Sequence, residues 1–113
     1  MIQLDLTYLN TISGGDQAFI HEMLKMFLTT TFPEMEALKQ HASEGTWDLF
    51  GSTAHKMKAP IQMLGVPAVA DLVFDLEHIG KSKIGVEGVS QKVQLLEEYI
   101  KELEIEINKI LNA

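Results

Sequence analysis

The spacing of apolar residues constrains the fold of this chain more than any other feature. Apolar side chains recur every three or four residues in four segments, and no useful length alternates apolar and polar residues at period two. These stripes predict helices at residues 18–41, about 46–64, 67 to about 80 and 89–111. We therefore predict an all-α fold, an antiparallel up-down-up-down four-helix bundle, with a short extra N-terminal helix from Asp5 to about Asn10.

Each long helix is expected to bury one stripe of side chains. For the first helix the predicted stripe is Phe19, Met23, Met26, Phe27, Thr30, Pro33, Ala37 and Leu38. For the second it is Phe50, Ala54, Met57, Ile61 and Leu64. For the last it is Val93, Leu96, Ile100, Leu103, Ile107 and Ile110.

Small and turn-forming residues mark the ends of these helices. Ser13 is a candidate N-cap for the first long helix, with Asp16 at its third helical position. Glu44-Gly45 supplies a stop, and Gly65-Val66-Pro67 ends one helix and begins the next. Residues 81–88 are predicted to be a loop.

Length and charge exclude several classes of protein. A chain of 113 residues fits one domain, so we expect a single unit over residues 1–113 and a monomer. Because 16 acidic residues outweigh 9 basic ones, the net charge of -7 argues against binding nucleic acid. The chain has no cysteine, which excludes disulfides and thiolate metal sites. No apolar run is long enough to span a bilayer and the start does not resemble a signal peptide, so we expect a cytoplasmic protein with no membrane contact.

His55 is the residue of greatest chemical interest. On a helical wheel it points roughly 130° away from the centre of the apolar stripe of its helix, which predicts that the imidazole faces solvent. Gly51, Ser52 and Ala59 lie near it and are small, so they would leave the ring open to a second protein. A neutral imidazole is a competent nucleophile near neutral pH.

Two polar neighbours could assist such chemistry. Lys58 could place an ammonium beside a phosphoryl group on the ring, and Gln62 could donate a hydrogen bond to the ring or to a phosphate oxygen. A lone histidine on a helix surface is nevertheless more often only a solvated residue, and Lys56 and Lys58 alone would be an ordinary basic patch.

The run His55-Lys-Met-Lys-Ala-Pro-Ile-Gln-Met-Leu-Gly65 favours the chemical interpretation, because it resembles the signature of histidine phosphotransfer (HPt) domains. The matching positions are His55, Met57, Lys58, Leu64 and Gly65. The family's fold is a four-helix bundle of about this length with the histidine in the second long helix. The resemblance therefore covers the whole chain.

The resemblance implies a function in phosphorelay signal transduction by two-component systems. His55 would accept a phosphoryl group through its ε nitrogen from a receiver-domain phospho-aspartate and pass it to another receiver. Lys58 would help to hold the group, and Gln62 is a frequent polar neighbour in the family. The partners would be response-regulator receiver domains and a hybrid sensor histidine kinase. The chain would be a carrier and not an enzyme, since it has no kinase or ATP-binding motif.

A transient docking surface is expected around the histidine. Its predicted members are Gly51, Ser52, Lys56, Ala59, Met63 and Val66.

Two positions depart from the family pattern. Ala59 stands where the family favours glycine, which would narrow the choice of partners. Pro60 stands where a serine or another small residue is usual, and a proline inside a helix is expected to bend it. Pro60 either alters how the histidine is presented or suits the packing at that turn.

Other functions have weaker support. His21, His41 and His78 are scattered over different helices, so neither a metal site nor a cofactor is expected, and Glu77-His78 is interpreted as a surface pair. A helical docking or scaffold domain without phosphorylation is the main alternative, favoured by Ala59 and Pro60. An acid-base enzyme is a third possibility, but no convergent carboxylate can be named.

Overall fold

Most of the described backbone is helical. The computed structural model describes residues 2–113, and within this range the elements are α1 (Thr7–Ser13), α2 (Gln17–Glu44), α3 (Trp47–Met63), α4 (Pro67–Ser82), the 3₁₀ turn η1 (Val86–Gly88) and α5 (Val89–Leu111). No strand occurs among these residues. The predicted all-α class is confirmed.

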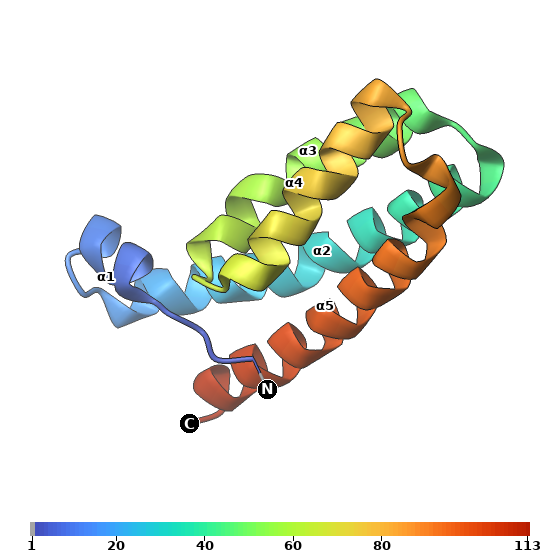
Figure 1. Ribbon diagram of the computed structural model, residues 1–113. Helices are drawn as coiled ribbons and strands as arrows, with labels where there is room; N and C mark the ends of the chain where they lie inside the picture. The colour runs from blue at the N-terminus through green and yellow to red at the C-terminus, as the bar shows by residue number, and fades with distance from the viewer. Residues whose placement is uncertain (1) are drawn as a thin grey trace.

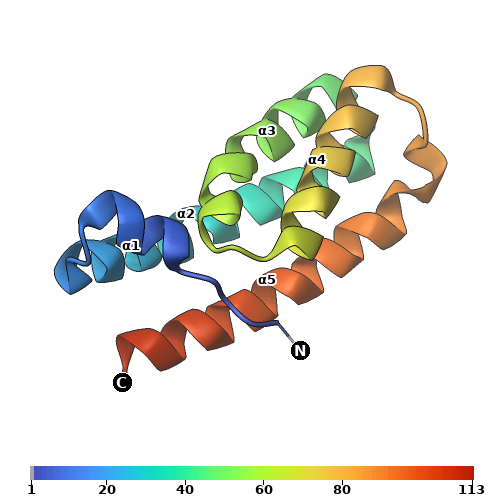
Figure 2. The same cartoon turned by 60° about the vertical axis from the view of Figure 1, so that its left-hand side comes forward.

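The four long helices form an antiparallel bundle. α2 packs against α3 and α5, and α4 packs against the same two helices, so each helix contacts its neighbours in the sequence and the bundle closes between α2 and α5. Figures 1 and 2 show the shorter α3–α4 hairpin lying over the longer α2 and α5. The predicted up-down-up-down arrangement with a short N-terminal helix is therefore correct.

Two of the three predicted apolar stripes, those of α3 and α5, are buried in the core as expected. The stripe of α3 is buried at every position, and that of α5 is buried except at Ile110, which is half-buried. Burying side chains of this size is the main source of stability in a chain that has no disulfide.

The stripe predicted for α2 is wrong by one residue along most of its length. Phe27 and Leu38 are buried as expected, but Phe19 and Met26 are exposed. The buried residues are Ile20, Leu24, Phe27, Thr31, Met35 and Leu38. Apolar residues occupy two adjacent sides of α2. The buried side is the one that packs against α3 and α5, and the spacing of apolar residues alone did not identify it.

The start of α2 also differs from the prediction. Ser13 is the last residue of α1 and does not cap α2. Asp16 is the N-cap, and its carboxylate accepts hydrogen bonds from the backbone N–H groups of Ala18 and Phe19 at 3.0 and 3.2 Å. The predicted stop at Glu44 and the start of α4 at Pro67 are confirmed.

Gly65 allows the segment around Asp5 to pack against the end of α3. Its φ of 69° is in the left-handed region, and a Cβ there would run into the backbone of Asp5. The backbone N–H of Asp5 also donates to the carbonyl of Leu64 at 2.9 Å. Asp5 thus lies ahead of α1, which begins at Thr7 and not at Asp5 as predicted.

Prolines do not interrupt the long helices. α2 continues through Pro33 to Glu44, and α3 continues through Pro60 to Met63. The bend expected at Pro60 remains a prediction.

Candidate functional site

The site lies on the α3–α4 hairpin, one turn from a close contact between the two helices. Gly51 and Gly80 are both buried at this contact, and a Cβ added to Gly80 would lie 2.5 Å from the Cα of Gly51. Only two glycines allow the helix backbones to come so near. Because the helices are antiparallel, this contact sets a register that pairs His55 with Glu77 and, one turn further on, Lys58 with Phe74.

His55 projects from α3 with most of its ring in solvent. Its side chain is 60% exposed, which confirms that the histidine faces outward. The ring is nevertheless anchored, because Nδ1 lies 2.6 Å from Oε2 of Glu77 on α4. No hydrogen bond to Nε2 is made by any group in residues 2–113.

Glu77 is the buried centre of the cluster. Its side chain is 9% exposed and accepts from the ammonium of Lys58 at 2.8 Å through Oε1 and from that of Lys81 at 2.7 Å through Oε2. The hydrogen bonds from Lys58 and then Lys81 lower the pKa of Glu77 to about 2, with a smaller contribution from His55, although burial opposes the change. Glu77 is therefore a carboxylate at neutral pH.

The ionised carboxylate determines which ring nitrogen carries the proton. A carboxylate can only accept hydrogen bonds, so the contact with Glu77 requires the proton of a neutral His55 to sit on Nδ1. The lone pair then resides on Nε2, the nitrogen directed away from Glu77. The arrangement can present an oriented, neutral imidazole nucleophile to a second molecule.

Lys58 is held beside the ring by two contacts. Besides its ion pair with Glu77, its ammonium lies 5.3 Å from the centre of the Phe74 ring, within the range of a cation–π interaction. Its side chain is 28% exposed, so the cation is close to the site and still open to a ligand.

Four further predicted residues lie on the exposed side of α3. Ser52, Lys56, Ala59 and Gln62 are all exposed. The hydroxyl of Ser52 donates to the carbonyl of Asp48 at 3.1 Å and thus stays on its own helix. The side chain of Gln62 makes no hydrogen bond to His55, and it lines a shallow groove with Ala59 and Tyr8.

Gly51, by contrast, is not beside open space. It is buried against Gly80, so the prediction that it leaves room next to the imidazole is wrong. α4 covers the side of α3 on which Gly51 lies. Gly51 therefore positions the two helices and does not offer a surface to a partner.

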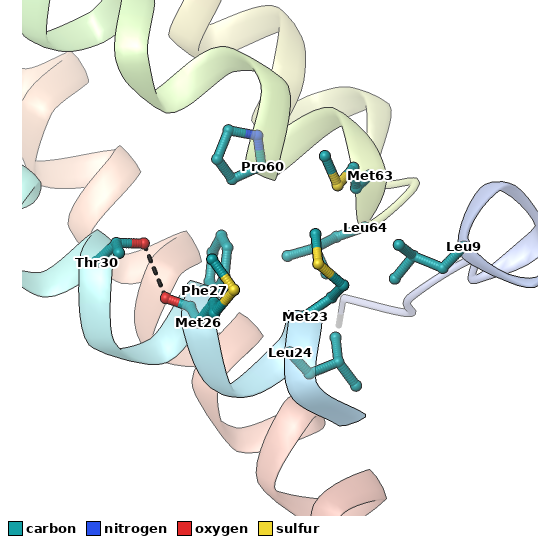
Figure 3. A pocket seen from close by; sticks show the side chains of 9 residues that line it. All are labelled: Leu9, Met23, Leu24, Met26, Phe27, Thr30, Pro60, Met63 and Leu64. Atoms are coloured by element: carbon teal, nitrogen blue, oxygen red, sulfur yellow. Dashed lines mark hydrogen bonds between the residues drawn. The ribbon is translucent and has the colours of Figure 1, made fainter. Parts of the chain in front are cut away.

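The apolar edge predicted to meet a partner consists of Met63 and Val66. Both side chains are half-buried, and both pack against the core. Met63 and Pro60 line an apolar pocket of about 90 Å³ between α2 and α3. Figure 3 shows both side chains on the α3 side, with Met23 and Met26 on the α2 side. This position of Pro60 agrees with a packing role.

Glu77 and Lys81 are the residues that the sequence prediction missed. The interpretation of Glu77-His78 as a surface pair is wrong, because Glu77 is buried against α3 while His78 is exposed. The four-residue spacing of Glu77 and Lys81 indicated that they share a face of α4. Only the register of α3 against α4 shows that this face meets His55.

Neither a metal centre nor a membrane helix is found in residues 2–113. No three His, Asp or Glu side chains in this range are arranged to hold a metal ion. No helix in the same range has the length and apolar content needed to cross a bilayer.

Comparison with known proteins gives one match. A family model described as Hpt domain matches residues 22–112, which include His55, the whole of α3, α4 and α5, and most of α2. The match confirms the resemblance inferred from the motif around His55. Neither a curated protein nor a solved structure matches the chain.

Proposed function

The chain belongs to the Hpt domain family, and we propose on this basis that His55 accepts a phosphoryl group from the phospho-aspartate of a receiver domain and passes it to another receiver. Hpt domains serve histidine phosphotransfer in phosphorelays as carriers. The observation that carries the proposal for this chain is the geometry of His55. Its ring is exposed, anchored through Nδ1 and without a hydrogen bond to Nε2 from residues 2–113.

The proposed step forms one bond and breaks one. The lone pair on Nε2 attacks the phosphorus of the acyl phosphate, and the P–O bond to the aspartate breaks, so that the aspartate leaves as a carboxylate with the bonding electrons. As the N–P bond forms, positive charge develops on the ring, and the Glu77 carboxylate at Nδ1 stabilises it. Loss of the Nδ1 proton to water then gives a phosphohistidine with a neutral ring and an anionic phosphoryl group. The reverse sequence discharges the carrier.

Lys58 is proposed to hold the phosphoryl group. Its ammonium is already beside the ring, and its partial exposure allows it to bind a phosphoryl oxygen as a compact cation. The receiver would supply the remaining stabilisation at its own site. Gln62 is proposed as a further donor once a partner has docked, because its amide is exposed two turns along α3 from His55.

The proposed partners are response-regulator receiver domains and a hybrid sensor histidine kinase. The chain has a net charge of -7, yet Lys56 and Lys58 of α3 and Lys81 of α4 lie near the histidine. A locally basic surface on an acidic protein suits the acidic pocket around a receiver's phospho-aspartate, and it steers the approach of the receiver more than it strengthens binding. Ser52 and Ala59, both exposed near His55, are proposed to lie in this interface.

Incubation with a phosphorylated receiver domain, or with phosphoramidate, tests the proposal. Intact mass should show the gain of one acid-labile phosphoryl group in the wild-type protein and none in His55→Ala. His78→Ala is the matched control, because His78 is an exposed histidine on α4 whose ring makes no hydrogen bond to the Glu77 carboxylate. If the wild-type protein takes up no phosphoryl group from several phosphorylated receivers, the carrier proposal fails and a docking-only bundle is the better account.

A further inference from the structure

Lys81 shares an acceptor atom with the histidine. Oε2 of Glu77 accepts from Nδ1 of His55 at 2.6 Å and from the Lys81 ammonium at 2.7 Å, while Oε1 is occupied by Lys58. Lys81 follows Glu77 by one helical turn, and its backbone lies against α3, where a Cβ on Gly51 would be 3.3 Å from the Lys81 nitrogen. The tight helix contact therefore holds this lysine at the site.

A carboxylate beside an imidazole has two opposing effects on a nucleophile. It fixes the proton on Nδ1, which leaves the lone pair on Nε2, but it also stabilises the doubly protonated imidazolium. An imidazolium has no lone pair and cannot attack phosphorus. A site that uses Glu77 to orient His55 must therefore limit the net negative charge that the ring experiences.

The two lysines provide that limit. With a neutral ring, the charges of Glu77, Lys58 and Lys81 sum to one positive charge, and protonation of His55 would add a second within the same cluster. This repulsion opposes formation of the imidazolium while the hydrogen bond to Nδ1 persists.

Charged groups of α2 and α5 do not bind the Glu77 carboxylate, and two of them pair with other residues. Glu34 of α2 interacts with Lys56, and Lys92 of α5 pairs with Asp75 of α4 at 2.6 Å. Among the described residues, the groups in contact with the Glu77 carboxylate are therefore those of His55, Lys58 and Lys81.

We infer that Lys81 is a positioning residue that offsets the charge of Glu77, so that Glu77 orients the His55 ring without converting it to the imidazolium. The effect of Lys81 on phosphoryl transfer rests on the proposed function of His55. Lys81 acts through Glu77 and is not required to touch the phosphoryl group.

The variants that test this inference are Lys81→Met, Lys81→Arg and, as the matched control, Lys83→Met. Lys83 is also an exposed lysine at the end of α4, but it approaches Asp48 at 3.7 Å and does not contact Glu77. Two measurements are made on each folded protein. One is the midpoint of the His55 ring titration by NMR, and the other is the rate of phosphoryl uptake against pH, normalised to the rate of the same protein at alkaline pH.

Lys81→Met should raise both midpoints by about 0.5 in pH, the effect of removing one cation at about 5 Å in a solvent-like dielectric. Uptake at acidic pH then falls by about threefold relative to the wild-type protein. Lys81→Arg should restore the wild-type midpoint, since it retains the cation, and Lys83→Met should leave it unchanged. A wild-type midpoint in Lys81→Met, or an equal rise in Lys83→Met, overturns the inference.

Failure of the proposed function gives a different result. If no variant and no wild-type sample takes up phosphate, the carrier proposal is overturned, yet the NMR titration still decides whether Lys81 offsets the charge of Glu77.

Discussion

Replacing Glu77 by glutamine should destabilise the protein near neutral pH and have almost no effect in strong acid. Glutamine resembles the protonated carboxyl group in size and keeps an oxygen that accepts hydrogen bonds, so the main change is the loss of charge. The carboxylate is buried and bound by two ammonium groups. Removal of this negative charge therefore raises the free energy of the folded state.

The magnitude follows from the pKa of Glu77. Its value falls from 4.5 to about 2 on folding, which corresponds to about 3 kcal/mol of stabilisation when the group is ionised in both states. Lys81 is 63% exposed, and solvent screening reduces the expected loss in Glu77→Gln to about 2 kcal/mol. Since the pKa is depressed in the folded state, this stabilisation is complete above about pH 4.5 and is lost as the pH falls through about 2.

Urea unfolding followed by circular dichroism, repeated from about pH 7 to about pH 2, measures the difference in the free energy of unfolding between Glu77→Gln and wild type. The titration of other carboxyl groups cancels in this difference. Glu22→Gln is the control, because Glu22 is 70% exposed and its pair with Lys25 is 3.5 Å long, so its effect should stay below about 0.5 kcal/mol at every pH. A difference for Glu77→Gln that is independent of pH, or no larger than that of the control, would refute the assigned role of the two lysines.

Three other substitutions test separate parts of the structure. Gly80→Ala should lower the free energy of unfolding by about 1–3 kcal/mol, because the new methyl group would meet the Gly51 backbone at 2.5 Å, and an unchanged urea midpoint would contradict the close helix contact. Lys58→Met should slow phosphoryl uptake by about tenfold through the loss of one charge-assisted hydrogen bond; a wild-type rate would show that Lys58 does not hold the phosphoryl group. Ala59→Trp should reduce transfer from a receiver at least about tenfold while uptake from phosphoramidate is retained, because this exposed residue lies one turn from His55 and a bulky ring there blocks only a large partner. Equal losses with both donors would instead point to damage at the histidine itself.

Features that depend on a single helix could be predicted from the sequence. The buried stripe of α3 and the exposure of His55 follow from 100° of rotation per residue, and the motif ending at Gly65 identified the family. The glycine itself has a physical reason, since its left-handed backbone and its contact with Asp5 exclude a side chain.

Features that depend on how two helices pack together could not be predicted from the sequence. The helical wheel places Gly51 near His55, but it cannot show that α4 covers one flank of that surface. The same missing information explains the error at Glu77 and His78, which point about 100° apart so that only one of them can face α3. Both errors are resolved by one quantity, the register of the α3–α4 hairpin, which long-range packing sets and local spacing does not.

The whole constellation around the imidazole comes from one hairpin, residues 47–82, because the ring, its carboxylate and both ammonium groups belong to α3 and α4. No side chain of α2 or α5 makes a hydrogen bond to the Glu77 carboxylate. The hairpin is thus a portable unit, which could be grafted onto a different pair of supporting helices provided that the glycine contact is kept. Conversely, the outward faces of α2 and α5 supply none of these groups, so substitutions there should leave the constellation intact.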